Sequence, residues 1–419
     1  MAQDSAPEKI ETLKSKAVRH STRGSLLAAI FMMATSAIGP GFITQTATFT
    51  EQMGAAFAFA ILASILVDFV VQLNVWRIVA LTRKRASDIA NLALPGSGYV
   101  LAALVIFGGL VFNIGNIAGA GLGMNAMLGL DPKIGGAISA ILAILLFSTK
   151  KLGTTVDRVM ILFGLLMIAM TIYMAFSSHP PVGEALKQTV WPSHINFATI
   201  TTIIGGTVGG YITYAGAHRL LDRGTVGKEN LPAITKGALS GIFITGVMRY
   251  ILFLGILGVV TAGGVLTSVG TIDNPAGRAF QIALGEIGLR LFGLIFWAAA
   301  ITSIIGAAYT SVTFMSAFYK DLDKNGQGPA TIIFIVIGLI AYELLGTTPA
   351  ALLVFAGGFN GLILPIGLTI FIYVGFFRSD LMEGYKYSRP FLIISALTCL
   401  LTWYMGALAF SKIFELLLS

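Results

Sequence analysis

Residues 204–211 read Ile-Gly-Gly-Thr-Val-Gly-Gly-Tyr and lie within an otherwise apolar stretch, 197–216. A second apolar stretch, 26–46, is interrupted by Gly-Pro-Gly at residues 39–41. Glycine and proline are poor helix residues, and a helix that breaks inside a bilayer frees backbone N–H and C=O groups that protein or a water-filled cavity must receive. Breaks in corresponding spans of two halves are typical of secondary transporters, whose solute sites they line near the midplane. The simpler interpretation is that the glycines only allow close packing of helices.

The composition is that of a membrane protein with many spans. Of the 419 residues, 56% are hydrophobic and 11% charged, against roughly 25% charged in a soluble domain. The single cysteine, Cys399, excludes an intrachain disulfide framework and a cysteine metal cluster. The sequence has no phosphate-binding Gly-x-x-x-x-Gly-Lys-Ser/Thr motif and no convergent acid, base and nucleophile. We therefore expect neither an ATP-driven pump nor an enzyme, and no cofactor.

Eleven apolar stretches are candidates for membrane spans. They are residues 26–46, 55–77, 99–118, 134–147, 159–176, 197–216, 238–261, 289–319, 330–345, 350–376 and 390–410. Arginine and lysine gather in alternate connections, so the positive-inside rule places the amino end in the cytoplasm and the carboxyl end outside. The net charge of +8 arises largely from these cations. The net charge therefore reflects the topology and does not indicate a nucleic-acid partner. We expect the protein to lie in a bacterial inner membrane.

The interrupted stretches are the first and the sixth, so two five-span halves must have opposite orientations. We expect a cytosolic tail at 1–23, a first repeat at 24–176, an inverted second repeat at 196–377 and an additional helix at 389–411. The predicted fold class is an all-α integral membrane protein with a 5+5 inverted repeat and an eleventh helix.

Several short motifs occur along the chain in a fixed order. They are Ile38-Gly39-Pro40-Gly41-Phe42, Gln72-Leu73 with Arg77, Asp157-Arg158-Val159, Trp191-Pro192-Ser193 and the stretch at 204–211. In their order and spacing the sequence resembles the Nramp (natural resistance-associated macrophage protein) family of divalent-metal transporters, over almost the whole chain. The resemblance implies a leucine-transporter-like fold with broken first and sixth helices, and a small-molecule substrate carried across the lipid bilayer.

The residues at the metal-binding positions differ from those of the family. In Nramp proteins an Asp and an Asn of the first span and a Met of the sixth bind the ion, and the resemblance places Gly39, Phe42 and Gly209 there. Divalent cations need oxygen, nitrogen or sulfur ligands. Since glycine and phenylalanine side chains offer none, we expect no metal site at these three residues.

The charged residues that the family associates with proton movement are replaced as well. Two acidic residues of the third span correspond to Asn113 and Asn116, and a histidine of the sixth span corresponds to Tyr211. The loss of charge favours an uncharged or anionic organic solute, because helix N-termini attract carboxylates. We expect a carboxylate or amino-acid-like solute moved by alternating access. The alternatives are a Mg²⁺ or Mn²⁺ transporter that uses backbone carbonyls, and a channel, which would conduct without exchange.

The predicted site combines the two breaks with nearby polar residues. The expected substrate-binding residues are Gly39, Gly41, Phe42, Gln45, Gly206, Gly209, Gly210, Tyr211, Asn113, Asn116 and Asn360. Asp68 and Arg249 lie mid-way along the second and seventh spans, where lone charges are expensive, so we expect them to form an ion pair. A sodium site is a further hypothesis, at the eighth-span hydroxyls of Thr302, Ser303, Thr310 and Ser311. His218 is expected to face solvent or lipid. The sequence leaves the coupling ion and the oligomeric state open.

Overall fold

The computed structural model describes residues 39–149, 153–267, 274–320, 322 and 326–415. Every regular element in these ranges is a helix. The predicted cytosolic tail and the part of the first span that precedes residue 39 lie outside the described residues.

The long elements of the described residues are fourteen α-helices connected by short segments. They are α2 (Pro40–Met53), α3 (Phe57–Thr82), α4 (Ala86–Ala93), α5 (Ser97–Leu128), α6 (Pro132–Ser148), α7 (Gly153–Ser177), α8 (Val182–Val190), α9 (Phe197–Val208), α10 (Ile212–Asp222), α11 (Leu231–Thr261), α12 (Pro275–Met315), α14 (Gln327–Leu344), α15 (Pro349–Phe377) and α16 (Arg389–Glu415) among the described residues, with the 3-10 turns η1 (Gly54–Ala56), η2 (Lys228–Asn230) and η3 (Ser379–Met382). Each predicted span overlaps one of these helices, and the sixth overlaps two, α9 and α10.

Local sequence signals set where several helices begin. The side chains of Asp131, Asn274 and Thr348 each accept a backbone N–H of the first turn, and each is followed by a proline. A capping oxygen satisfies an N–H that has no partner in the helix, and proline fits the first helical position because it lacks an N–H. These pairs therefore position the starts of α6, α12 and α15.

Fewer helices than predicted are long enough to cross a membrane on their own. In the described part of the chain, seven helical segments have the required length and apolar character, and an eighth counts if residues 162–177 and α8, bent by 108°, form one span. The break divides the sixth span into two short helices, and α6 has only 17 residues. In α12, Gly285 has non-helical dihedral angles, so a separate helical segment precedes the span predicted to begin at residue 289.

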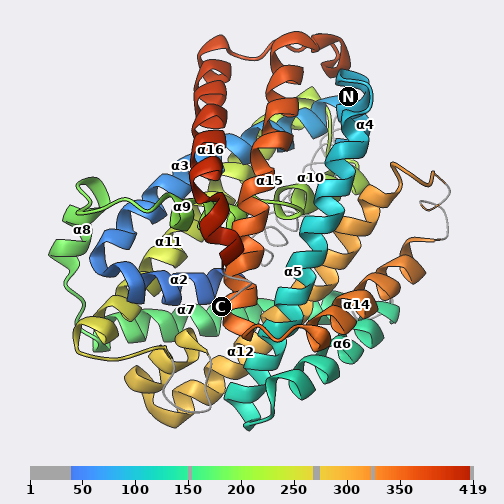
Figure 1. Ribbon diagram of the computed structural model, residues 1–419. Coiled ribbons are helices and arrows are strands. Elements are labelled where there is room, and N and C mark those ends of the chain that lie inside the picture. Colours follow the sequence, from blue (N-terminus) through green and yellow to red (C-terminus); the bar gives the residue numbers. More distant parts are fainter. Residues whose placement is uncertain (1–38, 150–152, 268–273, 321, 323–325, 416–419) are drawn as a thin grey trace, which may run out of the picture.

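The short helices α2 and α9 lie at the centre of the molecule. They contact each other, and both contact α15. Helix α2 also contacts α11, and helix α9 also contacts α3. The outer helices expose apolar side chains such as Leu145, Leu165 and Leu401, as expected of a lipid-facing surface. Figure 1 shows α15 and α16 side by side, joined at the top of the view, where α4 also lies.

Candidate functional site

The sixth predicted span breaks at its glycine pair. Helix α9 ends at Val208, Gly209 is extended (φ −75°, ψ 163°), and α10 begins at Ile212. Between them Gly210 has φ +52°, a backbone region that residues with a side chain rarely adopt. The prediction of a broken sixth helix is confirmed at the predicted residues.

The first predicted span begins its described part with a similar geometry. Gly39 is extended (φ −84°, ψ −174°), and α2 starts at Pro40. Proline at this position has no N–H to leave unpaired. Helix α2, which begins at this interruption, contacts α9 at the centre of the molecule.

Tight packing explains most glycines on the α9 side of the break. A Cβ atom on Gly205 would lie 1.9 Å from the carbonyl oxygen of Gly357, and one on Gly209 would lie 2.6 Å from the carbonyl oxygen of Gly205. On Gly210 it would lie 1.8 Å from Asn360 Oδ1. These three glycines thus allow α9 and its C-terminal end to pack closely within the bundle and against α15, as in the simpler interpretation of the sequence. Gly41 differs, because its nearest neighbours would be in ordinary contact at 3.7 Å.

Two amides fill the space that the glycines leave. Gln45 of α2 donates from Nε2 to the carbonyl oxygen of Leu353 (3.3 Å), and its Oε1 faces Gly206. Asn360 of α15 donates from Nδ2 to the carbonyl oxygens of Gly108 and of its own helix, while its Oδ1 faces Gly210. Both side chains are buried, and neither amide oxygen has a hydrogen-bond partner among the described residues.

The two asparagines of α5 have different surroundings. Asn116 lies beside the hydroxyl of Tyr211, whose ring packs edge-on against Phe112 with centroids 5.4 Å apart. Asn113 instead donates to the carbonyl oxygen of Ile304 in α12 (2.9 Å) and faces α14. Because helical residues turn by about 100° each, residues three apart point roughly 60° apart. The structure therefore brings Asn116, but not Asn113, to the break.

The ring of Phe42 stacks against the guanidinium of Arg249. The guanidinium carbon of Arg249 lies 4.0 Å from the ring centroid of Phe42, and its Nη1 donates to Thr207 Oγ1 (3.0 Å) and to the carbonyl oxygen of Ile203 (3.4 Å). Sequence reasoning missed Thr207 as a partner, although it stands within the glycine-rich stretch and four residues after Ile203.

The predicted ion pair between Asp68 and Arg249 is not a direct contact. Both side chains are buried and interact electrostatically, but they are not among the ion pairs within 4.0 Å that the described residues form. The contacts that Arg249 does make are instead with α9, through Nη1, and with the ring of Phe42. Asp68 Oδ1 has no hydrogen-bond partner in the described ranges.

Comparison with known proteins agrees with this geometry. The family model for natural resistance-associated macrophage protein-like proteins (Nramp) matches residues 30–411. The chain belongs to the Nramp family. It is 49% identical over 381 residues to the membrane protein YcsG of Bacillus subtilis (strain 168), covering 91% of this chain and 93% of YcsG.

Solved structures show the same fold at low sequence identity. A manganese transporter of Eremococcus coleocola matches with a TM-score of 0.76 and 13% identity, over 93% of this chain and 86% of that one. MhsT in complex with L-phenylalanine matches with a TM-score of 0.64 and 17% identity, over 93% and 98%. The leucine-transporter-like fold is thus confirmed for this Nramp protein, and its described residues contain the break in the sixth helix.

Within the described residues of this Nramp chain, no group of three or more His, Cys, Asp or Glu side chains could hold a metal ion. The eighth-span hydroxyls do not form one site either. Thr302 and Ser303 lie eight residues before Thr310 and Ser311, about 12 Å along a helix. Thr302 donates back to its own helix, and Ser311 faces Gly109 of α5.

A small cavity adjoins the break. Its volume is about 20 Å³, and Val71, Val105, Gly210, Thr213 and Gly367 are among the residues that line it. This is room for about one water molecule, whereas pockets for small organic ligands are typically about 300–1,000 Å³. This cavity is therefore too small for an organic solute in this conformation.

The prediction for His218 is wrong, because this side chain is only 3% exposed. The backbone N–H of Ala86 donates to His218 Nε2 (3.2 Å), and His218 Nδ1 lies 3.2 Å from Thr313 Oγ1. The ring also stacks on Phe314. With Nε2 as the acceptor, Nδ1 carries the proton and donates to Thr313. His218 thus connects α10 to the start of α4 and to α12.

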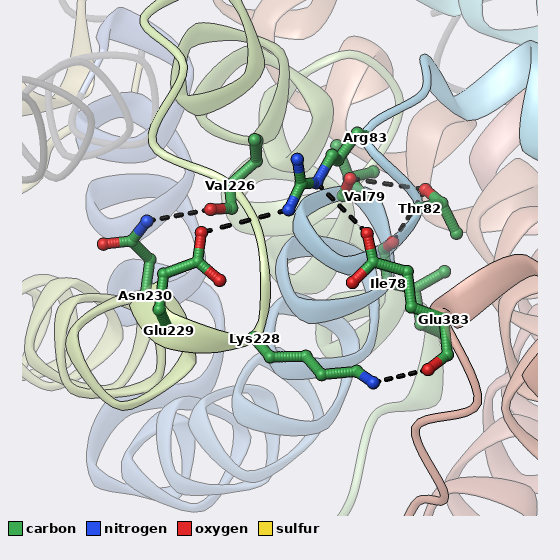
Figure 2. A network of polar contacts seen from close by, with 9 residues as sticks. All are labelled: Ile78, Val79, Thr82, Arg83, Val226, Lys228, Glu229, Asn230 and Glu383. Atoms are coloured by element: carbon green, nitrogen blue, oxygen red, sulfur yellow. Dashed lines mark hydrogen bonds and ion pairs between the residues drawn. The ribbon is translucent and has the colours of Figure 1, made fainter.

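One end of the Nramp protein carries a group of cations, and we call it the basic face: Arg83, Lys84, Arg85, Arg219, Arg223, Lys228, Arg378, Lys386 and Arg389. Figure 2 shows Arg83 between Glu229 and Glu383, at 3.9 and 3.4 Å, and Lys228 donating to the main-chain oxygen of Glu383. Hydrogen bonds from Arg378 hold the pKa of Asp380 below its ordinary value. These contacts join the end of α3 to the α10–α11 and α15–α16 connections.

Proposed function

We propose that this Nramp-family protein is a secondary transporter that moves a small organic solute, a carboxylate or an amino-acid-like molecule, by alternating access. The solute site is the break between α2, α9 and α10. One observation carries the proposal: Gln45 Oε1 and Asn360 Oδ1 are buried around the break without hydrogen-bond partners in the described part of the chain. Buried polar atoms normally have partners, and a solute with hydrogen-bonding groups would supply them.

The competing function is transport of Mg²⁺ or Mn²⁺, which the family's usual role and the fold shared with a manganese transporter suggest. The same fold is shared with a protein crystallised with L-phenylalanine, so the fold fits both classes of substrate. The side chains favour the organic solute. Gly39, Phe42 and Gly209 stand where the family has metal ligands, and none of them has a side-chain donor atom.

The proposed topology follows the positive-inside rule. The basic face lies in the cytoplasm of a bacterial cell, the amino end lies inside and the carboxyl end outside the inner membrane. The two repeats span 24–176 and 196–377, and 389–411 is an additional helix.

Calorimetry with Mn²⁺ and thermal-shift measurements with small carboxylates and amino acids test the proposal on the purified full chain. A ligand that binds only the folded state raises its stability. We expect stabilisation by an organic solute and no saturable Mn²⁺ binding at micromolar concentration. Micromolar Mn²⁺ binding without any organic ligand would overturn the proposal. Counterflow in proteoliposomes separates a transporter from a channel, because only the transporter exchanges solute for solute.

A further inference from the structure

Arg249 lies within one helical turn of both breaks. Its guanidinium stacks on Phe42, two residues after the start of α2 at Pro40, and bonds Thr207, next to the last residue of α9. A positive charge at this end of α9 is favourable, because the C-terminal end of a helix carries partial negative charge. Among the cations whose contacts the structure describes, Arg249 is therefore the one nearest to the predicted solute site.

The unused hydrogen-bond donors of Arg249 have a specific arrangement. Nη1 is bonded to α9, whereas Nε and Nη2 have no partner among the described residues. Nε–H and Nη2–H form the side edge of the guanidinium, and two parallel donors of this kind match the two oxygens of a carboxylate. The side chain is only 2% exposed, so this edge is kept from water as well.

No carboxylate of the described chain occupies that edge. Asp68 is the acidic residue that acts on Arg249 electrostatically, from α3, but it makes no contact within 4.0 Å and keeps Oδ1 without a partner. The α9 groups that face the pair, the Ile203 carbonyl and the Thr207 hydroxyl, are uncharged. An intramembrane charge that is not paired generally serves a substrate or ion pathway.

We propose that Arg249 recognises the carboxylate of the solute through its Nε and Nη2 donors, and that Asp68 balances its charge while the solute is absent. This inference rests on the proposed function and narrows the solute to an anion. Phe42 covers one face of the guanidinium, so the carboxylate approaches in the plane of the edge. The same positive charge, 4.0 Å from the ring at a metal-ligand position of the family, repels a divalent cation in a medium of low dielectric constant.

The test compares carboxylates with amides of nearly the same shape, which lack the negative charge and one of the two acceptor oxygens. Monocarboxylates from acetate to valerate, and L-amino acids, are each paired with the corresponding primary amide, and dissociation constants are measured on the purified full chain. Hydrogen bonds to charged groups are worth about 1.5–3 kcal/mol, so the wild type should bind a carboxylate at least about tenfold more tightly than its amide.

Four variants locate the source of this preference. Arg249→Lys keeps the charge but loses the paired donors, and should weaken carboxylate binding about tenfold. Arg249→Gln combined with Asp68→Asn removes both charges and should bind the carboxylate and its amide equally. Asp68→Asn alone should bind the carboxylate more tightly than the wild type. The matched control is Arg77→Gln, since Arg77 is also held by aromatic rings and by Tyr385 Oη (2.7 Å), but in α3 and away from the breaks. It should keep the wild-type preference.

Each outcome decides a different claim. If carboxylates bind the wild type and all Arg249 variants equally, the role of Arg249 is wrong and the proposed function stands. If amides bind as well as carboxylates in the wild type, the anionic class is wrong. If only Mn²⁺ binds, both the role of Arg249 and the proposed function are wrong. If the double variant does not fold, Arg249→Lys and Asp68→Asn still decide, since unchanged affinity in both overturns the inference.

Discussion

The break and the basic face use polar residues in opposite ways. At the break, Gln45, Asn360 and Arg249 are buried and each keeps at least one polar atom without a partner among the described residues. On the basic face, Arg83 is about half exposed and is shared by two acidic residues (Figure 2). Unpaired buried groups cost free energy, whereas exposed ion pairs contribute little. The difference indicates that the break is built to receive a ligand and the basic face to connect loops.

The largest effect is expected from a methyl group on the glycine interface behind the break. In Gly205→Ala the new Cβ would meet only backbone atoms of Gly357 and Gly361, at 1.9 and 2.2 Å, which cannot move aside as a flexible side chain can. We expect a loss of at least about 3 kcal/mol, at the upper end for overpacking, and a much lower melting temperature in detergent. Gly41→Ala is the control and should melt near the wild type. Equal melting of the two variants would contradict the packing described for α9 and α15.

The second prediction compares one kind of hydrogen bond in the two regions. Asn360→Ala removes the bonds to Gly108 and Ala356 at the break, and Asn230→Ala removes a bond to Val226 on the basic face (2.8 Å). We expect Asn360→Ala to lower the free energy of unfolding by about 2 kcal/mol and to abolish solute uptake. We expect Asn230→Ala to lower it by about 0.5 kcal/mol and to keep normal uptake. Unfolding and uptake per folded molecule measure both. Normal uptake by Asn360→Ala would remove this residue from the site.

His218 is buried between the two regions, and its replacement should have an intermediate effect. His218→Ala leaves the Ala86 N–H and the Thr313 hydroxyl without their ring partner. Leaving buried groups unpaired costs about 1–3 kcal/mol. His194, which is exposed, provides the control, and His194→Ala should unfold like the wild type. Equal unfolding of the two variants would mean that the His218 contacts do not stabilise the protein.

The smallest effect is expected on the basic face. Arg83→Ala removes two exposed ion pairs, each worth about 0–1 kcal/mol, so the melting temperature should fall only slightly. Because salt screens exposed charges, the difference from the wild type should shrink further at high ionic strength. A large, salt-independent fall in melting temperature would show that Arg83 stabilises the protein as a buried polar group does, and not through exposed ion pairs.

The sequence predicts the breaks well because their cause is local. Gly-Pro-Gly and the Gly209-Gly210 pair disfavour helix, and helix α9 ends within one residue of Gly209. Other glycine pairs, such as Gly357-Gly358 in α15, stay helical because neighbouring helices pack against them. Asn113 and His218 show the limit, since their roles depend on which neighbouring helix packs against them. A list of polar residues in a span does not give that information. The same holds for Arg249, where charge balance predicts Asp68 as the partner but α9 supplies the contacts.

The glycine contact between α9 and α15 has a mechanical consequence. Because there is no space for even a methyl group between Gly205 and the backbone of α15, we expect these two helices to move together as one rigid body. Helix α10, beyond Gly210, makes few contacts with α9. Hinges are generally a few residues at element ends that absorb a change in dihedral angles. We therefore expect α10 to rotate about residues 209–210 while α9 and α15 keep their relative positions. The two halves of the sixth span would then move by different amounts.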